Sequence, residues 1–479
     1  MKASILSLAL LTAAAVAGPM TVQATTRSPA ELTDAQRAWV AKAYRREKAG
    51  WIYLHLEGPP RERGFQHGYL LAQEIEQGIR ATRLGWTYQS SMDWQWLVAK
   101  ADTMFTPRID PEDLAELDGM VEGLGAAGVR SSRAELVAYN GIIELAGYWW
   151  PKYLKRIKDT ATPPPREGCS SFIATGSMTA DGNVVLGHNS MTGYADLSGA
   201  GNLILDVAPE KGHRILMQSV PGWIHSGSDF FVTDAGLVGS ETTLGGFEGF
   251  DSTGVPEFVR MRRATQDADS IGQWCAIMRQ GNNGGYANAW LLGDVNTREI
   301  ARLELGLRYV GFERKRDGWF SGSNVAEDLK VRRLETDTKE TDIRTSGAAR
   351  RLRWKQLMAQ YAGKIDVEAA KRFEADHYDV YLGEERPGIH SLCAHGELDH
   401  APASPDWQPN EPSGTVDGKV VDARMARRMS IAVRWGSGCG MAFDAAAFLA
   451  KYPQYDWMKD ILRSRPSQPW VEFTAGETK

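Results

Sequence analysis

Three consecutive prolines, Pro163 to Pro165, divide this 479-residue chain into two parts with different hydrophobic patterns. Proline lacks a backbone N–H and restricts the residue before it, so residues 162–167 can form neither a helix nor a central strand. Before this stretch, apolar residues recur mostly at helical spacing. After it, short apolar runs alternate with turn residues. We therefore expect an exposed linker that joins a mainly helical part to a sheet beginning at Cys169.

The hydrophobic spacing predicts elements on both sides of the linker. Helices are expected at residues 28–48, 110–124, 131–149, 256–279, 347–361, 367–375 and 444–449, and one more from the end of the 62–68 segment to about residue 80. Strands are expected at residues 50–57, 170–175, 183–187, 202–207, 214–220, 230–233, 237–241, 289–294 and 299–306. Residues 62–68 are interpreted as a glycine-rich turn, and Asp181-Gly182 is a hairpin signal that begins an antiparallel meander. Antiparallel strands with helices segregated around them predict an α+β fold.

The first 24 residues have the pattern of an export signal. Lys2 precedes an apolar run over residues 4–17, and Val22 and Ala24 are small residues at the positions a signal peptidase reads. The run is too short for a membrane span, and no later segment approaches the roughly 20 apolar residues that a span needs. We expect a periplasmic or secreted protein with no integral membrane segment.

Composition excludes several classes of function. With 43% hydrophobic residues, 24% charged residues and a net charge of −5, the chain is globular and lacks the basic bias typical of nucleic-acid binding. It contains no P-loop sequence, no G-x-S-x-G nucleophile elbow and no dinucleotide fingerprint worth defending. We expect a small-molecule or lipid substrate, no cofactor, no metal and no nucleic-acid partner. The oligomeric state stays open.

The junction between Gly168 and Cys169 suggests self-cleavage. Attack of the Cys169 thiol on the carbonyl carbon of Gly168 would give a thioester, and water would open it. The new α-amino group of Cys169 has an ordinary pKa near 8, close to the thiol value of about 8.5, so one residue would supply nucleophile and base. We expect a helical chain of residues 25–168 that stays associated with a catalytic chain of residues 169–479.

Several polar residues are candidates to act with Cys169. His188 lies on the strand expected to pair with that of Cys169, followed by Asn189. Hydroxyl-rich and amide-rich segments can present donors to an oxyanion, and they contribute the further candidates Asp229, Thr242, Thr243 and Asn288. Of these, Asn288 stands where a strand begins and is the best oxyanion candidate.

Motifs over nearly the whole mature chain resemble the phospholipase B-like family and the related autoproteolytic acyltransferase/hydrolase group of N-terminal nucleophile hydrolases. The matching segments are residues 63–68, 168–170, 187–188, 221–243, 255–260, 282–290, 301–304 and 435–440. The resemblance implies a four-layer αββα fold and metal-free hydrolysis of acyl esters or amides. It also implies autocleavage before Cys169.

Carried over residue by residue, the resemblance assigns site roles. It makes Cys169 the nucleophile and His188 its neighbour. It puts Thr243, or else Thr242, on the oxyanion side and Asn288 in the oxyanion hole. Met191 departs from the tryptophan or acid that relatives often have there, which leaves the substrate class open, and the family's arginine has no assigned position. The resemblance favours phospholipid-like esters; the alternative is an amide hydrolase or acyltransferase acting on N-acyl or peptide-like small molecules.

Two other interpretations remain. Residues 390–400 crowd six metal-binding side chains into one segment without a standard zinc spacing: His390, Cys393, His395, Glu397, Asp399 and His400. The simpler interpretation is a polar loop, with one disulfide, Cys393–Cys439, compatible with export. An exported, tryptophan-rich binding protein is the non-catalytic alternative, although a pure binder has no use for the Gly168-Cys169 junction.

Overall fold

The computed structural model describes residues 31–158, 168–196, 201–226, 230–402 and 407–477. The predicted export signal and most of the predicted linker lie outside the described residues. No helix in the described ranges is both long and apolar enough to cross a membrane.

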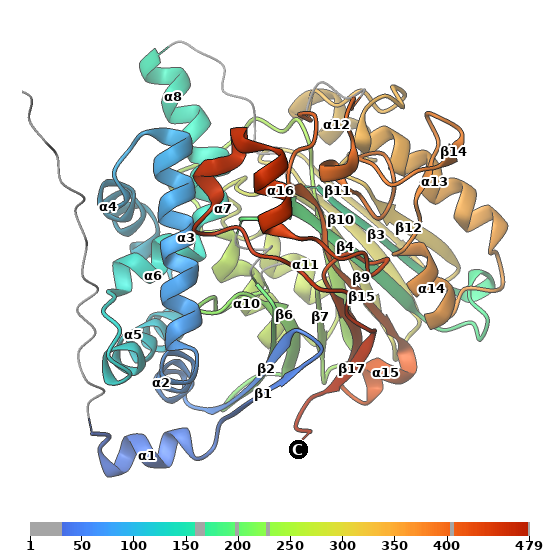
Figure 1. Cartoon of the computed structure of the whole chain (residues 1–479). Helices are drawn as coiled ribbons and strands as arrows, with labels where there is room; N and C mark the ends of the chain where they lie inside the picture. Colours follow the sequence, from blue (N-terminus) through green and yellow to red (C-terminus); the bar gives the residue numbers. More distant parts are fainter. Residues whose placement is uncertain (1–30, 159–167, 197–200, 227–229, 403–406, 478–479) are drawn as a thin grey trace, which may run out of the picture.

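Two large β-sheets form the centre of the molecule (Figure 1). The nine-stranded sheet has, in spatial order, β1 (Tyr44–Lys48), β2 (Trp51–Gly58), β5 (Leu203–Pro209), β6 (Ile215–Ser219), β7 (Phe230–Thr233), β8 (Leu237–Thr243), β9 (Asn288–Asp294), β10 (Glu299–Leu305) and β11 (Val310–Lys315). The six-stranded sheet has β12 (Gly318–Gly322), β3 (Gly168–Thr175), β4 (Val185–Gly193), β15 (Ser413–Asp422), β16 (Ser430–Trp435) and β17 (Val471–Thr474). Within both sheets every pairing is antiparallel except that of β2 with β5. A small hairpin pairs β13 (Tyr378–Asp379) with β14 (Glu384–Glu385).

Helices cover the outer faces of both sheets, with the N-terminal helices on the left of Figure 1 and α13 (Ser346–Gln360) and α14 (Val367–Phe373) on the right. One hydrophobic cluster joins the nine-stranded sheet to its helices, a second lies between the sheets, and a third joins the six-stranded sheet to α13 and α14. These clusters confirm the α+β class and the αββα layering. The first helical layer contains α1 (Asp34–Val40), α2 (Pro60–Leu70), α3 (Ala72–Ser90), α4 (Trp94–Phe105), α5 (Pro111–Ala126), α6 (Arg133–Asn140), α7 (Ile142–Glu144), α8 (Trp150–Lys158), α10 (Glu257–Asp267) and α11 (Ile271–Arg279).

Shorter elements complete the fold. The remaining α-helices are α12 (Leu329–Glu335), α15 (Ala423–Arg427) and α16 (Ala445–Lys451). The short turns of other helix types are η1 (Thr106–Arg108), η2 (Leu145–Trp149), η3 (Gly176–Met178), η4 (Gly396–Leu398) and η5 (Pro453–Met458).

Several expectations about local structure were wrong. The single helices expected at residues 131–149 and 256–279 are divided, the first into α6, α7 and η2 and the second into α10 and α11. The helix expected at residues 28–48 ends at Val40, and residues 44–48 form β1 instead. Ala49 and Gly50 have positive φ and make the tight turn that pairs β1 with β2. The segment 62–68 is part of α2 and is not a turn. The expected single meander is divided, because β3 and β4 belong to one sheet while β5 to β9 belong to the other.

The glycines of α2 serve helix packing. A Cβ on Gly64 would lie 1.8 Å from the carbonyl oxygen of Glu116, and one on Gly68 would lie 2.2 Å from that of Met120. Only glycine permits α2 and α5 to approach this closely. The motif at residues 63–68 therefore encodes the contact between these two helices.

The helical N-terminal part is integrated into the sheet layers. It contributes β1 and β2, and β2 pairs in parallel with β5 from the far side of the linker. Segments on both sides of the predicted cleavage point therefore share one sheet and one hydrophobic cluster. The boundaries of the two processed chains stay a prediction.

Candidate active site

Cys169 is the second residue of β3 and is nearly buried, with 8% of its surface exposed. Its backbone N–H donates to Oδ1 of Asn324 over 3.1 Å, and its carbonyl oxygen accepts from Nη1 of Arg350 over 2.5 Å. Its Sγ lies 3.9 Å from Oε1 of Glu241. The backbone of Cys169 is therefore fixed on both sides, while the thiol faces a carboxyl group of the opposite sheet.

Arg350 is an arginine at the site, a residue type for which the sequence offered no position. It projects from α13, and its Nη2 also donates to Oδ1 of Asn324 over 2.7 Å. Burial lowers the pKa of Arg350 to about 10, so the guanidinium still carries its charge at neutral pH. A sequence signal exists, because Arg350 lies four residues before the buried Trp354 and so shares its face of α13.

Asn324 joins Cys169 to the predicted oxyanion side. It follows β12, has a φ of 66°, and donates from Nδ2 to the carbonyl oxygen of Thr243 over 2.8 Å. One side chain thus contacts the backbone of the nucleophile and the end of β8. Sequence reasoning did not single out Asn324, because its partners lie 155 and 81 residues away.

Asn288 and Thr243 form a directly opposed pair on β9 and β8. Opposed residues of antiparallel strands present their side chains on the same face. Among the described residues, neither Nδ2 nor Oδ1 of Asn288 has a hydrogen-bond partner, and the same holds for Oγ1 of Thr243. Since buried polar groups are usually paired, these atoms are suited to bind a polar group of a substrate.

Thr242, the other candidate, lies against the six-stranded sheet. A Cβ on Gly322 would lie 2.3 Å from Oγ1 of Thr242, so β12 approaches β8 closely at this point. Gly322 in turn pairs with Ser171 of β3. Thr242 therefore packs near the start of the Cys169 strand, on the opposite face of β8 from Thr243.

His188 shares the face of Cys169 but stands two residues further along the sheet. It pairs with Ser171, whereas Ser190 is directly opposite Cys169. Its Nε2 lies 2.9 Å from the carbonyl oxygen of Glu241, which makes Nε2 the donor. Burial, assisted by the charge of Lys419, holds the pKa of His188 well below its usual value. His188 is thus a neutral side chain that bonds β8.

A buried ion pair, which sequence reasoning missed, adjoins Ser190. Nζ of Lys419 donates to Oγ of Ser190 over 2.8 Å and pairs with Asp417, and both charged residues are fully buried. Asp417 also accepts from the backbone N–H of Ser190 over 3.1 Å. The strand β15 was not predicted from the sequence, because a fully buried strand is ordinarily apolar and Asp417-Gly418-Lys419 carries two charges.

The remaining predicted residues lie elsewhere. Asn189 points to the opposite face of β4, where its Nδ2 donates to the carbonyl oxygens of Glu374 and Leu392 over 2.8 and 3.0 Å. Asp229 lies outside the described residues. Met191 is buried and pairs with Gly168, whose Cβ would lie 3.2 Å from that of Met191. Met191 therefore packs directly against the residue before the nucleophile.

The other cysteines do not form the expected disulfide. Cys393 and Cys439 are free thiols in the structure, and each sulfur lies near Nε2 of His395. Cys275 is buried in α11, and burial raises the pKa of its thiol to about 12, which makes it unreactive.

The cluster of donors at residues 390–400 does not assemble as a unit. His390 bonds Asp379 and a backbone carbonyl, His400 bonds Asn410, and Asp399 pairs with Arg386. Glu397 accepts from Tyr194. Of the six side chains in that segment, only those of Cys393 and His395 lie together, beside Cys439.

A cavity of about 360 Å³ lies beside the oxyanion segments. Its wall includes the apolar side chains of Tyr148, Phe247 and Leu307. Its charged lining residues are Lys152, Lys155, Glu248, Arg308 and Glu335. The ring of Tyr148 lies 6.3 Å from that of Tyr286, two residues before Asn288, and 6.1 Å from that of Phe247, four residues after Thr243.

Comparison with known proteins finds similarity to one family. The Phospholipase B family matches residues 131–309. The human phospholipase B-like 2 protein (Homo sapiens) is 34% identical over 203 residues, which are 40% of this chain and 33% of that protein. An uncharacterized protein of Archaeoglobus fulgidus is 24% identical over 286 residues, 55% of this chain and 46% of its own length. These matches confirm the resemblance to the phospholipase B-like family. The chain spans less than half the length of these curated relatives.

One group of solved structures has a weak similarity. A mutant conjugated bile acid hydrolase from Clostridium perfringens aligns with 9% identity and a TM-score of 0.31, covering 56% of this chain and 89% of that one. At this TM-score the similarity carries no argument about function.

Proposed function

We propose that this chain is an exported cysteine hydrolase of the N-terminal nucleophile type that removes acyl groups from phospholipid-like esters. The observation that supports this most is the environment of Cys169. Asn324 and Arg350 fix its backbone. Asn288, whose amide has no hydrogen-bond partner in the described part of the chain, lies on β9 and pairs with Thr243, the residue of β8 that Asn324 contacts.

Activation begins with self-cleavage. The Cys169 thiol attacks the carbonyl carbon of Gly168, the bond from that carbon to the nitrogen of Cys169 breaks, and the nitrogen takes a proton. Water then hydrolyses the resulting thioester, which gives a carboxylate on Gly168 and a free thiol on Cys169. Asn324 Oδ1 accepts from this nitrogen in the uncut chain and is placed to hold the new α-amino group.

Each catalytic cycle uses the same two groups of Cys169. The α-amino group takes the thiol proton, and the thiolate attacks the acyl carbonyl carbon. Nδ2 of Asn288 and Oγ1 of Thr243 donate to the oxyanion, each contributing on the order of 3 kcal/mol if typical. The ammonium group returns its proton to the leaving alcohol, and water releases the acyl group from sulfur.

The cavity lined by Tyr148 and Phe247 supports a substrate with an acyl chain. Its apolar wall suits hydrocarbon, and its charged lining has both signs, with Lys152, Lys155 and Arg308 beside Glu248 and Glu335. A thiolate attacks esters and amides alike, so the nucleophile does not determine the substrate class. The apolar cavity and the family match favour phospholipid over N-acyl amino acids.

Product analysis tests the proposed activity. Purified protein should release fatty acid from phosphatidylcholine and phosphatidylglycerol vesicles faster than from N-acyl amino acids, and Cys169→Ala should release none. Cys275→Ala is the matched control, since that thiol is buried in α11. Faster cleavage of N-acyl amino acids would replace the lipid assignment with amide hydrolysis. Vesicle binding without release of either product would identify a binding protein.

A further inference from the structure

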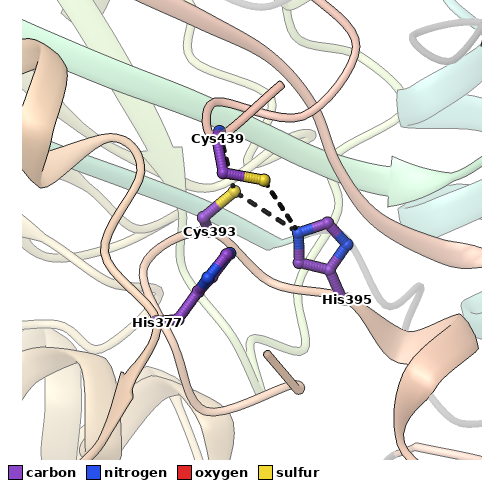
Figure 2. A group of neighbouring side chains, drawn as sticks. All are labelled: His377, Cys393, His395 and Cys439. Carbon is purple, nitrogen blue, oxygen red and sulfur yellow. Dashed lines mark hydrogen bonds between the residues drawn. The ribbon is translucent and has the colours of Figure 1, made fainter. Parts of the chain in front are cut away.

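Four side chains from three separate segments converge at one point behind the six-stranded sheet (Figure 2). They are His377, Cys393, His395 and Cys439, and one ligand atom from each lies within 4.8 Å of the other three. His377 follows α14, Cys393 and His395 precede β15, and Cys439 follows β16. We propose that these four residues bind a structural zinc ion.

The distances suit tetrahedral zinc. Zinc–sulfur bonds of about 2.3 Å and zinc–nitrogen bonds of about 2.0 Å place tetrahedral sulfur and nitrogen ligands about 3.5 Å apart. Nε2 of His395 lies 3.6 Å from Sγ of Cys393 and 3.4 Å from Sγ of Cys439. Two thiolates and two imidazoles are a common ligand set for structural zinc, and they leave no open position for a substrate.

The contacts of the His395 ring also suit a metal ligand. Nδ1 of His395 lies 3.0 Å from Oε1 of Glu397, so the carboxylate holds the ring proton on Nδ1. The lone pair on Nε2 then faces both sulfur atoms. A carboxylate that orients a metal-bound histidine in this way is usual in zinc sites. Oε2 of the same Glu397 accepts from the hydroxyl of Tyr194 over 2.7 Å, which fixes the carboxylate.

The contacts of His377, Cys393 and Cys439 also suit metal ligands. Nε2 of His377 is buried and makes no hydrogen bond to the described residues, and its ring lies 5.2 Å from that of His395. The backbone N–H of Cys439 donates to Sγ of Cys393, and that of Met441 donates to Sγ of Cys439, both over 3.4 Å. Such bonds stabilise thiolates, and a disulfide would instead need the sulfurs bonded to each other at about 2.05 Å.

The zinc site supports the strand that faces the nucleophile. Asn189 of β4 donates to the carbonyl oxygens of Leu392 and Glu374, which lie one residue before Cys393 and three before His377. Zinc would hold these two segments together behind β4 and so position Ser190, the residue opposite Cys169. The role is positional, and it is independent of whether the chain is a hydrolase.

Metal analysis of the purified full-length protein tests this proposal. We expect about one zinc per chain, and Cys439→Ser and His377→Gln should each lose it. His400→Gln is the matched control, because this histidine of the same region bonds Asn410 and should leave zinc content unchanged. When cobalt replaces zinc in the wild-type chain, the visible spectrum should show the absorption bands of tetrahedral cobalt and a thiolate-to-cobalt charge-transfer band. This measurement tests the site even if the variants do not fold.

Two results would overturn the proposal. One is a wild-type chain that contains no zinc and binds neither zinc nor cobalt when its thiols are reduced. The other is a Cys393–Cys439 disulfide in the native protein, detected by alkylation and peptide mass mapping without reductant.

Discussion

Replacing Asn288 should raise stability while it removes activity. Asn288 is fully buried, and neither polar atom of its amide has a hydrogen-bond partner among the described residues. A buried polar group without a partner costs on the order of 1–3 kcal/mol. In Asn288→Leu this cost disappears, and the branched apolar side chain has nearly the same shape. We expect the free energy of unfolding to rise by about 1–2 kcal/mol.

The same substitution should lower kcat. If Nδ2 of Asn288 donates to the oxyanion, its loss costs about 3 kcal/mol in the transition state, a decrease of roughly 10²–10³ in kcat. The assays are urea unfolding and fatty-acid release, with rates normalised to the fraction of chains that begin at Cys169. Normalisation separates slow self-cleavage from slow turnover.

Asn140 provides the opposite control. It is also buried, but its amide donates to the carbonyl oxygens of Leu136 and Gly222 and accepts from the N–H of Ile224. Asn140→Leu should therefore destabilise the protein by several kcal/mol, because three partners lose their bonds. A stability loss in Asn288→Leu together with unchanged kcat would show that Asn288 is a structural residue and would refute the oxyanion assignment.

Three further changes test the fold around the site. Burial raises the pKa of Glu144 to about 7, so the folded state holds this proton more tightly than the unfolded state, and stability should fall between pH 4.5 and pH 7. Urea titrations at pH 5 and pH 8 should show a decrease of about 2.5 kcal/mol that Glu144→Gln removes. Gly64→Ala should lower the stability by about 2–3 kcal/mol, because its Cβ would meet the Glu116 backbone, whereas Gly125→Ala, which meets nothing within 4 Å, should leave Tm unchanged or slightly raised. Lys419→Met should cost about 3–5 kcal/mol in urea unfolding by leaving Asp417 buried and unpaired, and equal stability of variant and wild type would show that the pair is not buried in solution.

Local patterns were sufficient to predict the parts of the site that lie close in sequence. The prolines and the Asp181-Gly182 turn indicated that a strand begins near Cys169 and pairs with the strand of His188, and the structure has this pairing. The amide-rich segment before β9 drew attention to Asn288. In each case the signal and the structure that it encodes lie within about twenty residues.

Long-range contacts were not predictable in this way. Arg350 contacts a backbone atom 181 residues away, and Lys419 contacts a side chain 229 residues away. Cys439 lies 44 residues from His395 and meets it only because β15 and β16 bring their flanking loops together. No spacing rule in one sequence indicates such pairs. The contact between His188 and the carbonyl oxygen of Glu241 is also of this kind, and the sequence therefore suggested only that His188 lies beside the thiol.

Intact mass measurement with N-terminal sequencing of the purified protein tests the central claim most directly. Wild-type protein should separate under denaturing conditions into two chains, the second beginning at Cys169, and Cys169→Ala should remain one chain. Cys275→Ala should be cut like the wild type. A wild-type chain that stays intact, or a Cys169→Ala chain that is still cut before residue 169, would contradict self-cleavage and the catalytic role that we derive from it.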